Sequence, residues 1–236
     1  MNKWLFQLEG DKFDLEELLR GFPDGEAYVI ERDGEYFIGG PIFENLSDAS
    51  AVHDEAIRVL DRYAAVISLL NPGFRKPAQY KVIQEMDGQR KAYVFASAHL
   101  TIRAKLTAVG TLSSDSAIES VQETQAQELI RGALADPHLD LALSVWSETI
   151  LTWPQLYRIL EEIEMYLGKH VYKAGLCSSK ARERFTRTAN AAEVAGVNAR
   201  HAAGKSSPPS NPMSLEEARD FIRRLLIGVL HRRLGS

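Results

Sequence analysis

Two Asp-Gly dipeptides, one on each side of a long helical stretch, constrain the fold of this chain more than any other feature. Asp33-Gly34 joins two alternating segments within residues 27–39, and Asp87-Gly88 joins two more within residues 80–98. Asp-Gly between segments of alternating apolar and polar residues is typical of a β-hairpin, because both residues tolerate the positive φ of a tight turn. The sequence therefore predicts two hairpins.

The stretch between the hairpins has a helical period. From about residue 47 to residue 70 apolar side chains recur with the spacing of one helix face, which predicts a long amphipathic helix. Asn71, Pro72 and Gly73 end it. The periodic apolar positions are Val52, Ala56, Val59, Leu60, Tyr63, Val66, Ile67 and Leu70.

The remaining segments of the first part complete a sheet. Residues 4–8 and 99–109 are predicted strands, and residues 15–19 a helical turn. A sheet and an amphipathic helix each have an apolar face to bury, so we expect the helix to lie across the sheet. This predicts an α+β domain over residues 1–110, with an antiparallel sheet packed against one long helix.

The pattern changes near residues 110–116, where small polar residues indicate a domain boundary. The helical period dominates after it, so residues 116–236 are predicted to form an all-α bundle of about five helices. These helices are predicted at residues 116–134, 139–148, 153–167, 179–190 and 215–234. Capping-box pairs open three of them, namely Ser116 with Glu119, Thr152 with Gln155, and Ser214 with Glu217.

Residue types that often carry chemistry are few and scattered. Cys177 is the only cysteine, so we expect neither an internal disulfide nor a multi-cysteine zinc site. The six histidines lack the paired spacing of a metal site, and no glycine-rich phosphate loop follows a strand. We therefore predict no metal and no cofactor. Without a secretory pattern or a bilayer-spanning apolar run, we expect a cytoplasmic protein with no membrane partner.

Charge divides the chain into two unequal parts. From Lys169 to the C-terminus there are 13 Lys and Arg against 5 Asp and Glu, a net charge of +8. The first 168 residues hold the other 15 and 27, a net charge of −12. A basic region attached to an acidic body suggests an anionic partner for the basic region.

A polar loop at residues 190–213, between the last two predicted helices, lies at the centre of this basic region. Arg200 offers a planar fork that suits phosphate or carboxylate, and His201 can change charge near neutral pH, so both are also candidate catalytic residues. The predicted ligand-binding residues are Arg184, Arg187, Asn190, Asn198, Arg200, His201 and Lys205.

The basic side chains have an alternative, internal role. They could pair with Glu161, Glu162 or Glu164, which the helical pattern places on an exposed face, or with the acidic first part of the chain. Phe185 has the position of a core residue rather than of a platform for stacking bases. The sequence leaves binding of an anion and internal pairing both open.

A helical bundle whose basic Asn-, Arg- and His-containing loop leads through prolines into a last amphipathic helix resembles the HEPN superfamily over roughly residues 116–236. That superfamily includes RNA-cutting toxins and phage-defence proteins, together with members that only bind nucleotides or partners. Its nuclease motif is an Arg followed closely by a His, usually with a polar residue after the Arg. His201 has no such Arg. The pairs Arg224 with His231 and Arg131 with His138 have the spacing, but Leu225 and Gly132 stand where the polar residue is expected.

Three function classes follow. The first is a binding or regulatory protein whose basic helical domain engages nucleic acid, a nucleotide or an acidic protein surface. The resemblance implies the second, a metal-independent RNase of HEPN type. It would use His201, Arg200, His231 or Arg224, unless the chain is a noncatalytic member. The third is a structural component or homo-oligomer in which acidic and basic parts pair between protomers.

Overall fold

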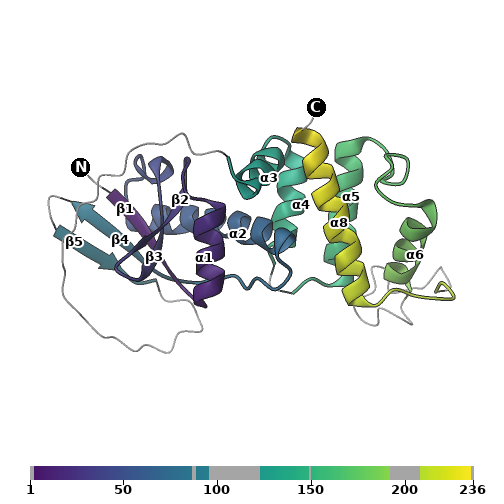
Figure 1. The fold of residues 1–236 in the computed structure, drawn as a ribbon, viewed down its shortest axis with the longest axis horizontal. Coiled ribbons are helices and arrows are strands. Elements are labelled where there is room, and N and C mark those ends of the chain that lie inside the picture. The colour runs from purple at the N-terminus through teal and green to yellow at the C-terminus, as the bar shows by residue number, and fades with distance from the viewer. Residues whose placement is uncertain (1–2, 87–88, 96–122, 149, 192–207, 235–236) are drawn as a thin grey trace.

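The computed structural model describes residues 3–86, 89–95, 123–148, 150–191 and 208–234. Over these residues the protein has the predicted α+β class, with an antiparallel sheet and a long helix followed by a set of further helices (Figure 1). The sheet lies at one end of an elongated molecule, and the last helices lie at the other end.

The sheet has five strands in the order β2-β3-β1-β4-β5, and every neighbouring pair is antiparallel. The first hairpin is confirmed, because Asp33 and Gly34 take φ values of 55° and 78° in its turn. The second pair of strands also forms as predicted, but its turn at residues 87–88 and the predicted strand at 99–109 lie outside the described residues. The strands are β1 (Lys3–Glu9), β2 (Tyr28–Arg32), β3 (Glu35–Gly39), β4 (Ala78–Met86) and β5 (Gln89–Tyr93).

Two helices pack with the sheet. The helix α1 (Lys12–Gly21) follows β1, and α2 (Ala49–Leu70) is the predicted long helix, with Asp48 accepting hydrogen bonds at its N-terminus. Its predicted apolar face is buried except for the half-buried Leu70. The second half of α2 is buried on more than that face, because it extends beyond the sheet to contact the helices that follow (Figure 1).

The first described helix of this part begins at Gln125. Thr124 has an extended backbone and caps the first described helix through its hydroxyl and the Gln127 side chain, so the predicted continuous helix over residues 116–134 is wrong. The Thr124 hydroxyl also donates to the Gly21 carbonyl at 2.6 Å, which attaches this helix start to α1. The helices are α3 (Gln125–Leu134), α4 (Pro137–Trp146), α5 (Trp153–Leu167), α6 (Ser179–Asn190) and α8 (Leu215–Leu234).

Other helix boundaries follow the sequence signals. Asp136 caps α4, Thr152 with Gln155 caps α5, and Gly168 ends α5 in the left-handed region with a φ of 60°. Ser214 and Glu217 exchange the hydrogen bonds of a capping box at the start of α8. The pair Ser116 with Glu119 lies outside the described residues.

One apolar core runs from the inner face of the sheet through α2 into the helical part. Polar contacts reinforce the junction. Arg62 of α2 forms two hydrogen bonds with Asp140 of α4, at 3.0 and 2.9 Å, and the Trp146 indole donates to Ser68 at 2.9 Å. The predicted division into domains 1–110 and 116–236 falls outside the described residues and stays a prediction.

Replacement of Gly40 by alanine is expected to destabilise the fold by about 3 kcal/mol, because a φ of 139° is strained for any residue with a Cβ. The added Cβ would also lie 2.3 Å from the Glu26 carbonyl oxygen. Urea unfolding measures the change. Gly168→Ala is the control, since its position has a φ of 60° with nothing within 4 Å, and it should lose only about 1 kcal/mol. Equal losses would contradict the clash at Gly40.

Candidate functional site

The structure tests only part of the predicted ligand-binding set. Arg184, Arg187 and Asn190 lie on α6, whereas the loop residues fall within 192–207, outside the described residues. The predicted residues that cannot be placed are therefore Asn198, Arg200, His201 and Lys205.

The two predicted arginines of α6 hold the chain that follows. Arg184 donates to the carbonyls of Asn211 at 2.6 Å and Pro212 at 3.1 Å, and pairs with Glu217 at 3.0 Å. Arg187 donates to the Pro208 carbonyl at 3.3 Å. These contacts fasten the start of α8 to α6, so both guanidinium groups have an internal role.

Asn190 differs from the arginines. Its side-chain oxygen is buried and accepts no hydrogen bond from the residues that the structure describes. The arginines of α6 therefore behave as structural groups, whereas the Asn190 oxygen has no internal partner within the described part of the chain.

Glu164 is the centre of a half-buried ionic cluster. Its two carboxylate oxygens accept hydrogen bonds from Arg182 at 2.6 and 2.7 Å, from the Val171 amide at 3.1 Å, and contact the His170 ring at 2.9 Å. Burial alone raises the pKa of this carboxyl, but the hydrogen bonds from Arg182, His170 and Val171 outweigh it and leave the pKa below its usual 4.5. The same contact with Glu164 raises the pKa of Arg182.

The prediction that the acidic face of α5 is solvated is wrong for two of its three residues. The Glu162 side chain is only 5% exposed and pairs with Arg158 at 2.6 Å and His138 at 2.7 Å. The Glu164 side chain is 15% exposed. Glu162 is buried and Glu164 half-buried, each beside a basic side chain of its own helix or of a neighbouring element. The contact of Arg182 with Glu164 confirms internal pairing for that arginine.

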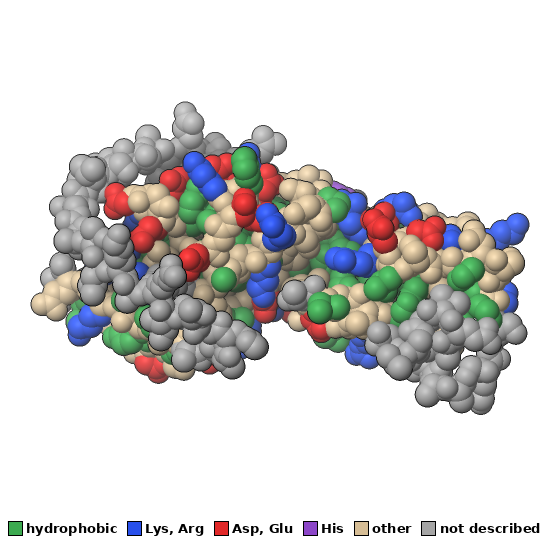
Figure 2. Space-filling model, turned by 90° about the horizontal axis from the view of Figure 1, so that it is seen from below, with side chains coloured by type: hydrophobic (Ala, Val, Ile, Leu, Met, Phe, Trp, Pro, Cys, Tyr) green, Lys and Arg blue, Asp and Glu red, His purple; other side chains and the backbone are tan. Residues whose placement is uncertain are grey.

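Lysines make up the exposed charge of this region. Residues 169–191 contain six Lys and Arg against one Glu. Lys169, Lys173 and Lys180 are exposed, and no ion pair involves them within the part of the chain that the structure describes. We call residues 168–191, which connect α5 to α6 and include α6, the basic end. It lies farthest from the sheet (Figure 1), and Lys and Arg side chains stand at that end in Figure 2.

The end of α8 adds two arginines beside the basic end. Arg232 donates to the carbonyls of Ala174 and Gly175, and the Arg233 guanidinium lies 5.7 Å from the centre of the Tyr166 ring. These contacts fix the α5–α6 connection. The sequence analysis did not identify the α5–α6 connection as a candidate site, because it placed the site in the polar loop at 190–213. The lysines and glycines between two predicted helices were a usable signal for this connection.

Of the candidate nuclease residues, Arg200 and His201 lie outside the described residues, and Arg131 and His138 each bind a different carboxylate. Arg131 pairs with Glu123 at 2.9 Å, while His138 contacts Glu162, so this pair is divided between two carboxylates. Arg224 and His231 are exposed on α8. Among the described residues no group of three His, Cys, Asp or Glu side chains could hold a metal ion.

Cys177 has no sign of activation as a nucleophile. Burial raises the pKa of its thiol, and the nearby Arg182 guanidinium offsets that effect only in part. The side chain is half-buried and packs against the core. The thiol form is therefore favoured at neutral pH.

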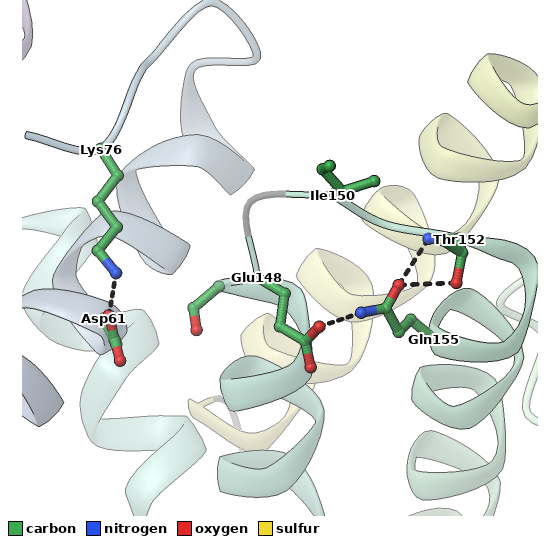
Figure 3. A pocket seen from close by; sticks show the side chains of 7 residues that line it. Asp61, Lys76, Glu148, Ile150, Thr152 and Gln155 are labelled. Carbon is green, nitrogen blue, oxygen red and sulfur yellow. Dashed lines mark hydrogen bonds and ion pairs between the residues drawn. The ribbon is translucent and has the colours of Figure 1, made fainter. Parts of the chain in front are cut away.

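A cleft lies at the junction between the sheet-bearing part and the helical part. Its outer mouth, of about 670 Å³, is lined by Asp61, Lys76, Glu148, Ile150 and Gln155 among others (Figure 3). Lys76 forms an ion pair with Asp61, and Gln155 bridges Glu148 and Thr152 across the mouth. A deeper hollow of about 590 Å³ shares Lys76 and Glu148 with the mouth.

Comparisons of the chain with family models, with curated proteins and with solved structures found no match. The resemblance to the HEPN superfamily therefore stays a prediction. None of the described helices is long and apolar enough to cross a bilayer.

Replacement of Glu164 by glutamine is expected to destabilise the protein by about 2 kcal/mol at neutral pH, because the charge-assisted hydrogen bonds to Arg182 are lost. The folded-state pKa of Glu164 is lowered, so its contribution is complete above the unfolded-state value of about 4.3 and disappears as pH falls through the folded-state pKa. Urea unfolding of parent and variant between pH 7 and pH 3 measures this.

Glu183→Gln is the matched control, because that exposed carboxylate lies 3.6 Å from Arg187 on the same helix. Its effect should stay below about 0.5 kcal/mol at every pH. A parent-to-variant difference at Glu164 that did not shrink in acid would contradict the role of its charge.

Proposed function

We propose that this protein is a nucleic-acid-binding module that engages the phosphate backbone through its basic end. The observation that carries the proposal is the exposure of Lys169, Lys173 and Lys180 without an ion pair in the described part of the chain. Surface lysines usually have a carboxylate among their neighbours, whereas here one Glu accompanies six cations in residues 169–191.

The division of labour between arginine and lysine supports this function. Arg182, Arg184 and Arg232 are bound to carboxylates or carbonyls and hold the backbone of the basic end in place. Lysine is a compact point charge on a flexible stem, which suits contacts to phosphate that do not depend on base sequence. We therefore expect binding that is electrostatic and only weakly selective among sequences.

Aromatic rings beside the lysines extend the proposal to unpaired strands. The rings of His170 and Tyr172 lie 5.7 Å apart at an angle of 20°, next to Lys169 and Lys173 in the sequence. His170 is exposed and Tyr172 is half-buried. Aromatic rings beside cations give bases a surface on which to stack. The acidic body, with its net charge of −12 over the first 168 residues, would repel a polyanion and orient it toward the basic end.

The remaining alternatives stay predictions. No specific contact among the described residues favours the HEPN-type RNase, and the acidic partner surface or homo-oligomer would use the same lysines. The alternatives can be distinguished by experiment. An RNase would degrade the RNA that it binds, and a homo-oligomer held by charge would dissociate to a smaller mass as salt rises.

The double variant Lys173→Ala/Lys180→Ala should weaken binding to a fluorescent single-stranded RNA and lower the magnitude of the slope of log K against log salt by about 1.4. Each lysine that neutralises a phosphate releases a counterion, so its removal lowers that slope. Fluorescence anisotropy at several salt concentrations gives the slope.

The matched control is Lys12→Ala/Lys91→Ala, which removes the same charge from exposed positions on α1 and β5. It should leave the slope within error of the parent. Binding that is absent, independent of salt, or equally affected by the two double variants would disprove the proposal.

A further inference from the structure

The deep part of the junction cleft has the size and position of a small-molecule site. Its volume of about 590 Å³ falls within the range of roughly 300 to 1,000 Å³ that is usual for ligand pockets. It lies between α2, the segment 72–77, the end of α4 and the first turns of α8. Sites where two structural parts meet are common places for ligands.

The floor of the cleft is apolar. Phe74, Trp146 and Leu151 line it and are largely buried by their neighbours. The polar atoms of the floor are already satisfied, because the Trp146 indole donates to Ser68 at 2.9 Å and the Ser68 hydroxyl donates to the Ala65 carbonyl at 2.8 Å. The floor can therefore pack against the apolar part of a ligand, and its polar atoms need no hydrogen bond from that ligand.

Arg223 places a fixed positive charge at this floor. Its guanidinium donates to the carbonyls of Leu69 at 2.6 Å and Leu70 at 3.3 Å, at the C-terminus of α2. Within the described residues no carboxylate forms an ion pair with it, and the side chain is only half exposed. The helix dipole offsets about half a charge there, and a guanidinium has five donor hydrogens, so charge and donors remain for a ligand.

Arg219 adds a second cation one turn earlier on α8. It also lines the cleft, it is exposed, and the described part of the chain gives it no ion pair. Arg75 and Lys76 also line the cleft, from the 72–77 segment, but Arg75 is paired with Asp11 and Asp14. Lys76 is paired with Asp61.

The acidic side chains that line the cleft contribute less to the charge that a bound ligand would meet. Glu216 and Asp220 are exposed on α8, where water screens their charges as it screens that of Arg219, and Glu148 accepts a hydrogen bond from the Gln155 amide. The one half-buried charge in the lining without a carboxylate partner among the described residues is that of Arg223. The cleft thus favours an anion whose charged group reaches this arginine.

We propose that the junction cleft binds a small organic anion with one carboxylate or phosphate on an apolar, ring-sized body. Arg223 and Arg219 hold the oxyanion, and the body packs against Phe74, Trp146 and Leu151. This site is distinct from the basic end, and the proposal does not depend on nucleic-acid binding. Carboxylate and phosphate share the chemistry that the two arginines recognise.

The test uses the full chain with four probes, namely 2-naphthoate, 2-naphthyl phosphate, the neutral 2-naphthamide and inorganic phosphate. Isothermal titration calorimetry or ligand-observed NMR measures each affinity. At least one naphthyl anion should bind with a Kd below about 1 mM, and the amide and inorganic phosphate should each bind at least about fivefold more weakly. Which of the two anions binds better identifies the head group.

Arg219→Ala should weaken the binding of that anion by about fivefold, the size of one exposed charge contact. Arg224→Ala is the matched control, because it removes the same charge from an exposed position of α8 that does not line the cleft. Thermal unfolding of both variants checks that the fold is retained. Three results would overturn the proposal: neither naphthyl anion binds, the amide or inorganic phosphate binds equally well, or the two variants have the same effect.

Discussion

The enclosure of α2 by apolar side chains on several sides is the constraint on which the rest of this structure depends. Residues 63–67 are buried one after another, which a helix at the surface of a sheet could not achieve. The sheet and α1 cover one side, and α3 and α4 cover another. Phe22 stacks on Tyr63 with ring centres 3.6 Å apart, and the Tyr63 hydroxyl donates to the Ala27 carbonyl. The Arg223 guanidinium on α8 donates hydrogen bonds to the last carbonyls of α2. A residue near the end of the chain thus caps the C-terminus of a helix that lies early in the sequence.

This arrangement explains why the junction between the two parts is hollow on one side. The sheet and the helical bundle both pack on α2, and neither fills the space beyond its C-terminus. The segment 72–77 and the start of α8 border that space, and both carry cations because the helix terminus beside them has a partial negative charge. The same physics separates arginine from lysine at the basic end. Planar, multidentate arginines are used for buried contacts to Glu164 and to carbonyls, while the strongly hydrated lysines remain exposed.

Local signals predicted the elements well. The Asp33-Gly34 hairpin and the capping pairs at Thr152 and Ser214 depend on residues a few positions apart, and all three form. The start of α3 was missed although Thr124 and Gln127 form a capping box, which is a local signal. Only the contact of Thr124 with Gly21 depends on tertiary packing. Of the candidate site, the sequence identified the basic region and named the arginines of α6. It left open whether they bind a ligand or pair internally, because their carbonyl partners at 208, 211 and 212 come from a chain segment whose position depends on packing.

The sequence by itself determined where helices and strands form, which face of each is apolar, and that cations gather after residue 168. Only the tertiary structure decided which charged side chains form internal ion pairs. Glu162 and Glu164 have the spacing of a solvated helix face, yet Glu162 is buried and Glu164 half-buried, because His138, Arg158 and Arg182 converge on them. Periodicity records which residues share a face, but the free energy of a charge depends on burial and on partners far away in sequence. The same limit applies to the cleft, which exists only because α2, α4 and α8 meet.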